Sequence, residues 1–254
     1  MMKITMLGTG TSIGVPEMLC GCPVCCSTDP HDKRLRTSAL IETATTKILL
    51  DCGPDFRQQV LVNGIDRLDG VFLTHEHYDH VAGIDDLRPF CKNHDVDIFA
   101  EQFVIDHLMQ RIPYCFGVNK YPGTPSLVLN AVAPGDIVQV GDIKVEILRV
   151  FHGKLPIVGF KIGNMAYITD IKTMPREEMD KIMGIKYLFV TALHMKEHPT
   201  HQNLEQAIGF VRDVHAENAW FLHMSHRIGF HSETDATLPC GMHLAFDGLQ
   251  INID

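Results

Sequence analysis

The segment 74–80 constrains this chain more than any other, because it places four potential metal ligands within six consecutive residues. They are His75, His77, Asp79 and His80. The segment follows a short apolar run at 71–73, which predicts a buried strand, and precedes residues 81–87, where small and apolar side chains recur at helical spacing. The ligands therefore lie where a strand ends and a helix begins. Imidazole and carboxylate groups are good ligands for divalent transition metals.

The spacing within this segment predicts two metal ions. His75 and His77 are two residues apart, so their side chains point to the same face of an extended chain. Asp79 and His80 are adjacent at the start of a helical turn and point elsewhere. One segment thus offers two pairs of ligands. The alternative, a histidine-rich loop without metal, would gather several titrating groups to no purpose.

A second group of candidate ligands lies in the irregular, Gly- and Pro-containing loop around residues 20–26. Cys20, Cys22 and Cys25 have the spacing C-x-C-x2-C, which brings three thiolates within reach of one tetrahedral zinc ion. A fourth ligand has to come from elsewhere in the chain. Cys26 is an additional thiol whose role the spacing leaves open. The alternative is that these cysteines bind no metal and pack as small apolar side chains.

Length and composition bound the remaining possibilities. No linker or low-complexity stretch interrupts the 254 residues, which predicts one domain over 1–254. Without an apolar stretch of membrane-spanning length or a signal peptide, we expect a cytoplasmic protein that contacts no membrane. A net charge of −9 argues against nucleic acid as a partner, because nucleic-acid binding needs a basic surface. Eight cysteines in the cytoplasm indicate thiols or metal ligands rather than disulfides.

Short strands interleaved with helices run through the whole chain, and several strands end at a His or Asp residue. The expected strands are 3–7, 37–43, 47–50, 71–74, 97–100, 127–132, 137–140, 144–150, 158–162, 166–169, 187–190, 220–222 and 246–253. The expected helices are 55–62, 101–111, 175–183 and 204–215, and residues 228–235 are expected to form a loop. The same order of strands and helices recurs weakly in the second half. This predicts two sheets packed face to face with helices outside.

Three of the residues that follow expected strands are further candidate ligands: His152, Asp170 and His223. Together with His75-x-His77-x-Asp79-His80, they resemble the metallo-β-lactamase superfamily in both order and placement. The resemblance covers the whole chain. It implies an α/β fold, a four-layer αβ/βα sandwich of two mixed sheets with a dinuclear metal site at one edge.

This resemblance also implies a role for each ligand. One divalent ion would bind His75, His77 and His152, and the other would bind Asp79, His80 and His223. Asp170 would bridge the two ions. Asp51, at the end of its strand, matches a family aspartate that supports the metal ligands from behind.

A narrower resemblance rests on Gly8-Thr9-Gly10-Thr11, the cysteine spacing and Leu222-His223-x-Ser225-His226. These motifs resemble the phosphoribosyl cyclic phosphodiesterases of the bacterial phosphonate-degrading carbon–phosphorus lyase pathway. The resemblance implies one structural zinc bound by Cys20, Cys22, Cys25 and His226. It also implies that His201 serves as a proton donor or base, and that the active-site metals are manganese or zinc. The alternative for His201 is an ordinary exposed loop residue, and we expect no catalytic role for His194 or His198.

The expected function is hydrolysis of a small phosphodiester, cyclic or not, by a hydroxide that bridges the two ions. His201, Asp79 and Asp170 are the expected catalytic residues. Relatives of this kind are often dimers, so a homodimer is implied, with loop 112–125 either at an interface, over the active site or packed on its own aromatic side chains.

Three other functions stay open on the sequence. A tRNA 3′-processing endonuclease needs a basic RNA-binding arm, which this acidic chain does not show. A cofactor-biosynthesis or redox protein on the same fold is the second, since the quinone-cofactor biosynthesis B protein also carries an early cysteine cluster. The third is a metal-binding module without catalysis.

Overall fold

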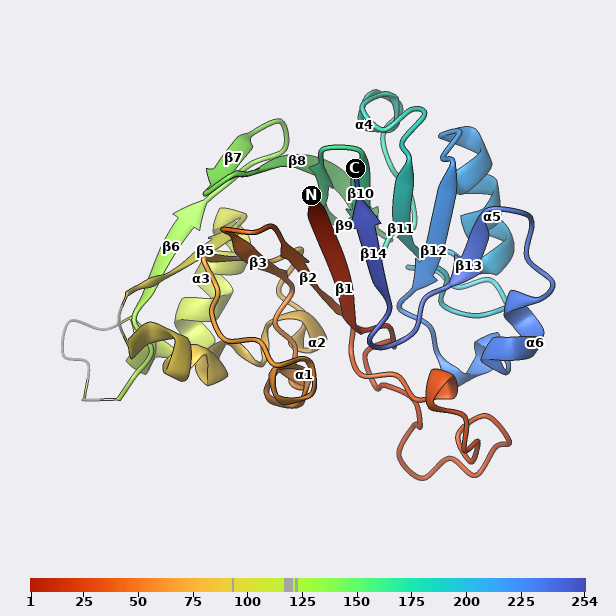
Figure 1. Ribbon diagram of the computed structural model, residues 1–254, viewed down its shortest axis with the longest axis horizontal. Helices are drawn as coiled ribbons and strands as arrows, with labels where there is room; N and C mark the ends of the chain where they lie inside the picture. Colours follow the sequence, from red (N-terminus) through yellow and green to blue (C-terminus); the bar gives the residue numbers. More distant parts are fainter. Residues whose placement is uncertain (93, 117–120, 122) are drawn as a thin grey trace.

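The computed structural model describes residues 1–92, 94–116, 121 and 123–254, and its centre is a pair of seven-stranded sheets (Figure 1). The first sheet has the order β14 (Gln250–Ile253), β1 (Met2–Gly8), β2 (Ser38–Glu42), β3 (Lys47–Leu50), β4 (Gly70–Phe72), β5 (Val96–Ala100) and β6 (Leu127–Ala131). The second has the order β13 (Met242–Leu244), β12 (Asn218–Leu222), β11 (Tyr187–Thr191), β10 (Met165–Ile168), β9 (Leu155–Ile162), β8 (Ile143–His152) and β7 (Ile137–Val140).

Each sheet is antiparallel on one side and parallel on the other. In the first sheet β14, β1, β2 and β3 pair antiparallel, whereas β3 to β6 pair parallel. In the second sheet β7 to β10 pair antiparallel, whereas β10 to β13 pair parallel. Parallel neighbours need crossover connections, so the carboxyl ends of these strands gather at one edge of each sheet. The two mixed sheets flanked by helices confirm the expected α/β fold class.

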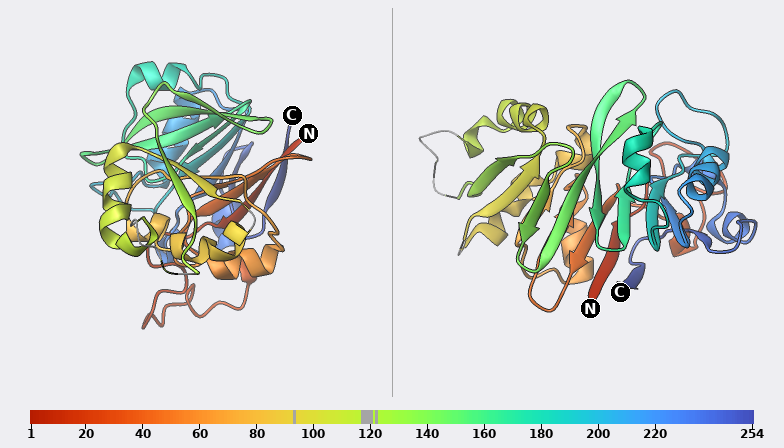
Figure 2. Two further views of the ribbon diagram at one scale, coloured as in Figure 1. Left: turned by 90° about the vertical axis from the view of Figure 1, so that its left-hand side faces the viewer. Right: turned by 90° about the horizontal axis from the view of Figure 1, so that it is seen from above.

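Helices cover the outer faces of both sheets (Figure 2). Beside the first sheet lie α1 (Phe56–Asn63), α2 (Tyr78–Val81) and α3 (Gln102–Arg111), and beside the second lie α4 (Arg176–Asp180), α5 (Leu204–Asp213) and α6 (His231–Asp235). The 3-10 helices are η1 (Pro30–Asp32), η2 (Ile84–Lys92), η3 (Pro113–Cys115) and η4 (His226–Ile228). Among the residues that the structure describes, no helix is long and apolar enough to cross a membrane.

Strand β11 illustrates how the pattern of apolar residues produces these layers. Its run Tyr187–Thr191 is apolar on both faces, as expected for a strand buried on both sides. Leu188 and Val190 face α5 and belong to the outer core, whereas Phe189 lies between the sheets with Phe72 and Phe160. Burying one such aromatic side chain contributes roughly 1.5–3 kcal/mol. The layers therefore hold both sheet edges, and the turns that follow the strands, in fixed positions.

Several boundaries differ from the expectations. Residues 81–87 do not form one helix: α2 ends at Val81 and a 3-10 helix, η2, follows, with Pro89 inside it. Proline has no N–H for a helical hydrogen bond, which favours such an irregular segment. Residues 231–235 form the helix α6 instead of a loop, and the three-residue strand β13 was not expected. The expected strand 246–253 begins only at Gln250, because Gly248 turns the chain at φ +90°.

Of the loop 112–125, residues 117–120 and 122 lie outside the described part of the chain. In the described part, the rings of Tyr114 and Tyr121 lie 6.3 Å apart. Cys115 is buried in the core beside α3.

Candidate metal centres

Three of the candidate ligands and supports lie in turns that follow strands and have left-handed backbones. Asp51 follows β3, Asp170 lies two residues beyond β10, and His223 follows β12, with φ values of 59°, 56° and 57°. Residues other than glycine rarely adopt this conformation, which costs of order 1 kcal/mol at each position. All three side chains are buried at the same edge of the sandwich. The strain at three neighbouring turns therefore belongs to one site.

The Asp170 carboxylate lies at the centre of this site, between histidines of both sheets. Its Oδ2 is 2.9 Å from His80 Nε2 and 3.3 Å from His75 Nε2, and both histidines follow β4 of the first sheet. Its Oδ1 is 3.0 Å from Nδ1 of His223, which follows β12 of the second sheet. One carboxylate thus contacts ligands from both halves of the fold.

Two groups of ligands surround Asp170. On one side, ligand atoms of Asp79, His80, Asp170 and His223 all lie within 4.8 Å of one another. On the other side, the ring of His77 lies 4.5 Å from that of His75 and 5.2 Å from that of His152. The structure therefore brings all seven candidate ligands together in two sets that share Asp170. We call these seven residues the His/Asp cluster.

Buried polar atoms without a hydrogen-bond partner indicate whether the His/Asp cluster is suited to bind a metal. Four of them are buried and have no hydrogen-bond partner: Nε2 of His75, His80 and His223, and Oδ2 of Asp79. Each such atom costs about 1–3 kcal/mol when it is left unsatisfied. Divalent cations would satisfy them, and the mixed nitrogen and oxygen set suits manganese or zinc. The donor set therefore fits bound metal ions.

Asp51 supports the cluster from behind through two neighbours. Its Oδ2 is 2.7 Å from His80 Nδ1, which leaves Nε2 of the same ring directed at the cluster. Its Oδ1 accepts a hydrogen bond of 2.8 Å from the backbone N–H of Thr74. Gly53 and Gly83 allow this close packing, since a Cβ on Gly53 would lie 2.1 Å from the Asp79 carbonyl oxygen. Such outer contacts fix the orientation of a metal-binding histidine.

Three further supports were not found from the sequence. The hydroxyl of Thr74 lies 3.0 Å from Nδ1 of His75. The hydroxyl of Thr37 lies 3.2 Å from Nδ1 of His223, and the carbonyl oxygen of Thr200 lies 2.9 Å from Nδ1 of His152. Their partners are up to 186 residues away in the sequence, so no local pattern marks them. The position of Thr74 next to His75 was the one available signal.

Opposite charges at short range dominate the electrostatics of the cluster. Burial disfavours the charged form of His80, but the carboxylates of Asp79, Asp170 and Asp51 outweigh it and raise its pKa well above the ordinary value. Burial, reinforced by the neighbouring His80, lowers the pKa of His75 well below its ordinary value. For Asp170, burial is outweighed by the charges of His223 and His80, which hold the pKa of the carboxyl well below its ordinary value. The cluster therefore keeps Asp170 ionised, as a metal ligand must be.

His201 lies at the open side of the His/Asp cluster. Its ring is 4.4 Å from that of His152 and 5.1 Å from that of His223, and its Nδ1 is 3.8 Å from Asp170 Oδ1. The backbone around it is held by an N-terminal cap, in which the Asn203 side chain accepts the N–H of Gln206. Burial lowers the pKa of His201 to about 3. The imidazole is therefore neutral at physiological pH.

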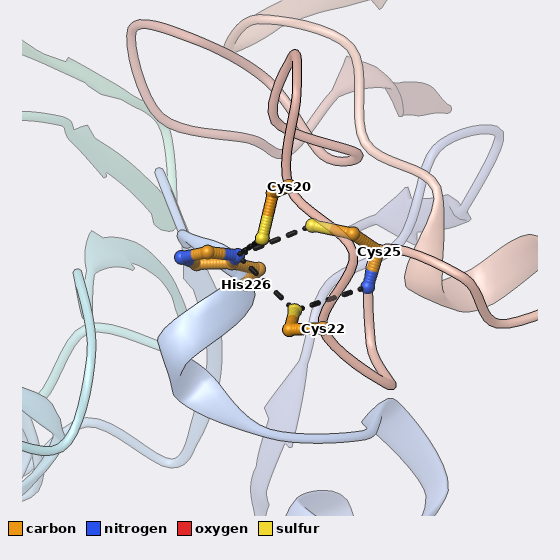
Figure 3. Close-up of side chains that lie close together, drawn as sticks. All are labelled: Cys20, Cys22, Cys25 and His226. Carbon is orange, nitrogen blue, oxygen red and sulfur yellow. Dashed lines mark hydrogen bonds between the residues drawn. The ribbon is translucent and has the colours of Figure 1, made fainter.

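The cysteine loop meets His226 at a second centre (Figure 3). The Sγ atoms of Cys20, Cys22 and Cys25 lie 3.3, 3.4 and 3.1 Å from Nδ1 of His226. Around a tetrahedral zinc ion these distances are about 3.5 Å, because zinc binds sulfur at about 2.3 Å and nitrogen at about 2.0 Å. The four residues, which we call the cysteine centre, thus fit zinc. Cys26 is exposed and is not part of this group.

Glu17 and the backbone support the cysteine centre. Oε2 of Glu17 is 3.3 Å from Nε2 of His226, which leaves Nδ1 of that ring for the metal. The backbone N–H of Cys25 donates to Cys22 Sγ at 3.4 Å and lowers the pKa of that thiol to about 7. Thiolate is the form that binds zinc. The acidic partner Glu17 was not recognised from the sequence, where it lies among uncharged residues.

Comparison with curated proteins finds relatives that are named for different activities. Over its full length the chain is 49% identical to an octanoyltransferase of Porphyromonas gingivalis, of which it covers 52%. Over 166 residues it is 27% identical to a ribonuclease Z of Bradyrhizobium diazoefficiens, with 63% of this chain and 49% of that protein covered. The chain thus spans about half the length of the first curated relatives it matches.

Solved structures share the whole fold. A diphosphatase from the PhnP family superposes with a TM-score of 0.92 at 35% identity, covering 98% of this chain and 96% of that one. The Zn²⁺-bound PqqB from Methylobacterium extorquens superposes with a TM-score of 0.81 at 18% identity, covering 99% of this chain and 100% of that one. The second likeness concerns the fold alone.

A family model connects these likenesses to the candidate site. The model of the beta-lactamase superfamily domain matches residues 46–224, which is more than half of the chain. The match begins just before β3 and includes all seven members of the His/Asp cluster, from His75 to His223. The chain therefore belongs to the beta-lactamase superfamily.

Proposed function

We propose that this chain is a metal-dependent phosphodiesterase that hydrolyses a small phosphodiester at the His/Asp cluster. The observation that carries the proposal is the position of Asp170, whose two oxygens lie 2.9 Å from His80 and 3.0 Å from His223. A carboxylate that lies between two sets of ligands is suited to bridge two ions. The ions in this proposal are manganese or zinc.

The proposed ligands divide as the two groups around Asp170 suggest. His75, His77 and His152 hold one ion, Asp79, His80 and His223 hold the other, and Asp170 contacts both. When bound, a pair of divalent ions lowers the pKa of a shared water and neutralises charge on the phosphoryl oxygens. Asp51 and the threonines behind the histidines keep the ligands in orientation, so little rearrangement accompanies the reaction.

His201 is the proposed proton donor to the leaving oxygen. Its Nδ1 is buried without a hydrogen-bond partner, and its ring faces the rings of His152 and His223. Burial lowers the pKa of His201, and the negative charge of a bound phosphodiester opposes that effect. The ring then gains a proton where the leaving group needs one. A leaving group that is stable as an anion needs this help least.

The PhnP-family diphosphatase supports chemistry at phosphorus, since its 35% identity extends over 98% of this chain. The net charge of −9 supports a small substrate over RNA, although ribonuclease Z relatives share part of the chain. Structural zinc at the cysteine centre is part of the same proposal.

The test is hydrolysis of bis-p-nitrophenyl phosphate by the purified chain with added Mn²⁺. We expect turnover that a chelator abolishes and Mn²⁺ restores. A companion measurement compares His201→Gln on this ester and on a dialkyl phosphodiester, whose only leaving group is an alkoxide. The variant should lose about 10²-fold or more where the alkoxide leaves, and much less with p-nitrophenolate. Absence of phosphodiester turnover with Mn²⁺ or Zn²⁺ would overturn the proposal.

A second candidate is hydrolysis of an octanoyl thioester, which the 49% identity to the Porphyromonas gingivalis octanoyltransferase favours. This chain spans 52% of that relative, so the name describes a protein about twice as long. An octanoyl thioester in the same assay separates the candidates. Turnover of the thioester without turnover of the phosphodiester would replace the first proposal by the second.

A further inference from the structure

His201 is carried by the segment that connects β11 to α5. Backbone hydrogen bonds close the base of this segment, one of them from the N–H of Leu193 to the carbonyl of Gln202 at 3.0 Å. Residues 195–201 lie beyond the base, and we call them the His201 loop. Most of this loop is exposed, whereas His201 itself is buried where the chain returns to the His/Asp cluster. The position of its imidazole therefore depends on what holds the returning end of the loop.

Two backbone groups on either side of His201 are fixed to the second sheet. The carbonyl of Thr200 accepts a hydrogen bond of 2.9 Å from Nδ1 of His152, a member of the His/Asp cluster. The N–H of Gln202 donates to the carbonyl of Ile171 at 2.8 Å, and Ile171 directly follows the carboxylate at the centre of the cluster. Neither contact can be removed without changing a candidate ligand or the backbone.

The carbonyl of His201 is held by a side chain, that of Lys172. Its Nζ donates to this carbonyl at 3.3 Å and to Oε1 of Gln206 at 3.0 Å. Oε1 of Gln206 also accepts the N–H of Asn203 at 3.3 Å, as part of the cap of α5. One ammonium group therefore joins the backbone of His201 to the first turn of the following helix. Hydrogen bonds from a charged donor are about twice as strong as those between neutral groups.

Lys172 is itself fixed beside the cluster. Its backbone N–H donates to the carbonyl of Phe151 at 2.7 Å, and Phe151 directly precedes a candidate ligand in β8. The side chain is half-buried. Lys161 and Lys181 pair with glutamates, whereas Lys172 contacts neutral oxygens among the residues that the structure describes. Its contribution is therefore to hold two oxygens in place rather than to neutralise a charge.

We propose that Lys172 is a positioning residue for the proton donor His201. It holds the backbone of His201 against the cap of α5 and thereby keeps the imidazole 4.4 Å from the ring of His152 and 5.1 Å from that of His223. The inference rests on the proposed function of His201. An alkoxide leaving group needs the donor in its place, and a displacement of about 1 Å can cost about 10²-fold in rate.

The experiment measures kcat and KM of Lys172→Met on bis-p-nitrophenyl phosphate and on the dialkyl phosphodiester. Methionine keeps an apolar stem of similar length and removes the donor. We expect kcat to fall about tenfold on the dialkyl ester and about twofold or less on the p-nitrophenyl ester, with little change in KM. Lys172→Arg retains a cationic donor and should recover most of the loss. No loss on the dialkyl ester in Lys172→Met would overturn the proposal.

A double variant tests whether Lys172 acts through His201. His201→Gln combined with Lys172→Met should be no slower on the dialkyl ester than His201→Gln alone, because the donor that Lys172 positions is already absent. Effects that multiply, or an equal loss on both esters, would show that Lys172 acts on the fold or the ligands instead. Lys161→Met on β9 removes another half-buried ammonium and is the matched control, which should keep both rates.

Hydrogen exchange gives a readout that needs no substrate. The amides of residues 195–203 should exchange about tenfold faster in Lys172→Met, while those of β8 and β12 stay as protected as in the wild-type chain. Unchanged exchange in this segment would overturn the positioning role and leave the phosphodiesterase in place. If the wild-type chain hydrolyses neither ester, the proposed function fails and the role of Lys172 in it fails as well.

Discussion

The two candidate metal centres of this chain are built in opposite ways. The cysteine centre takes three of its four residues from the six positions 20–25, and only His226 comes from a distant part of the chain. The His/Asp cluster combines the turn after β4 with residues at the ends of β8, β10 and β12, which belong to both sheets. We expect the cysteine loop to need a bound ion to keep its conformation, whereas the two packed sheets hold the residues of the His/Asp cluster in place without one. The first centre should therefore affect stability and the second chemistry.

Burial follows the same division. Six of the seven residues of the His/Asp cluster are buried and only His77 is half-buried, whereas in the cysteine centre only Cys25 is buried and Cys20, Cys22 and His226 are half-buried. Charges inside a low-dielectric site interact more strongly than charges near water. Removing a ligand from the cluster should therefore have the larger effect on the reaction.

The largest expected effect follows from replacing Asp170 by alanine. The carboxylate contacts both sets of ligands, so its loss should reduce metal content by about one to two ions per chain. We expect phosphodiester turnover to fall by at least about 1,000-fold, measured with bis-p-nitrophenyl phosphate alongside metal analysis. Asp213→Ala, an exposed carboxylate on α5, serves as the control. Full metal content and activity in Asp170→Ala would remove Asp170 from the site.

Replacing Asp51 by asparagine tests the layer behind the ligands. Asparagine has the same shape and tolerates the left-handed backbone at this position, so the fold should persist. It cannot match the charge that faces His80 Nδ1 at 2.7 Å. We expect metal affinity or activity to fall 10- to 100-fold, with partial recovery at high Mn²⁺. Wild-type affinity in this variant would show that His80 is oriented by packing alone.

That the residues of the His/Asp cluster lie together could be predicted because candidate ligands and strand ends coincide in the sequence. His75 to His80 follow an apolar run, and His152, Asp170 and His223 each follow another, so the resemblance could assign all seven before any contact was visible. The cysteine spacing pointed to a tetrahedral ion for the same local reason, while His226 came from the resemblance. The α/β class followed from interleaved periodicities.

Other features depend on contacts that no local pattern encodes. Thr37 meets His223 only after β1, β2 and β12 have assembled, and a threonine is common in any strand. No residue type in the local sequence predicts the left-handed backbones of Asp51, Asp170 and His223, because only glycine is a clear signal of such turns. The helix α6 has five residues and β13 has three, too few to display a period.

Replacing Cys22 by serine tests the other side of the comparison. The variant should lose one zinc ion per chain, because serine is a poor ligand for zinc, and its Tm should fall by about 5 °C, equivalent to about 2 kcal/mol for a chain of this size. Activity should fall by less than about tenfold, since the His/Asp cluster stays assembled. Cys26→Ser, one residue beyond the centre, is the matched control and should keep both zinc and Tm. Zinc retained in Cys22→Ser would mean that the cysteines only pack together.

The smallest expected effect concerns Asp247, which links the residue after β1, Thr9, to Leu35 in the segment that follows the cysteine loop. Its carboxylate accepts the hydroxyl of Thr9 at 2.7 Å and the N–H of Leu35 at 2.7 Å. Burial raises the pKa of Asp247 to about 6, although these hydrogen bonds and the charge of Arg34 oppose the shift. Because the folded chain holds this proton more tightly than the unfolded chain, the associated stability is present below about pH 4. It is lost as the pH rises through about 6.

Asp247→Asn removes this titration and keeps the shape of the side chain. Between pH 5 and pH 7 the free energy of unfolding of the wild-type chain should decline by about 1 kcal/mol more than that of the variant. Urea unfolding at several pH values measures the difference in slope, which does not depend on the constant loss of one hydrogen bond in the variant. If the free energy of unfolding depends on pH in the same way in both proteins, the carboxyl of Asp247 does not titrate with a raised pKa. In that case the segment that links the two centres would make no contribution to the pH dependence of the free energy of unfolding.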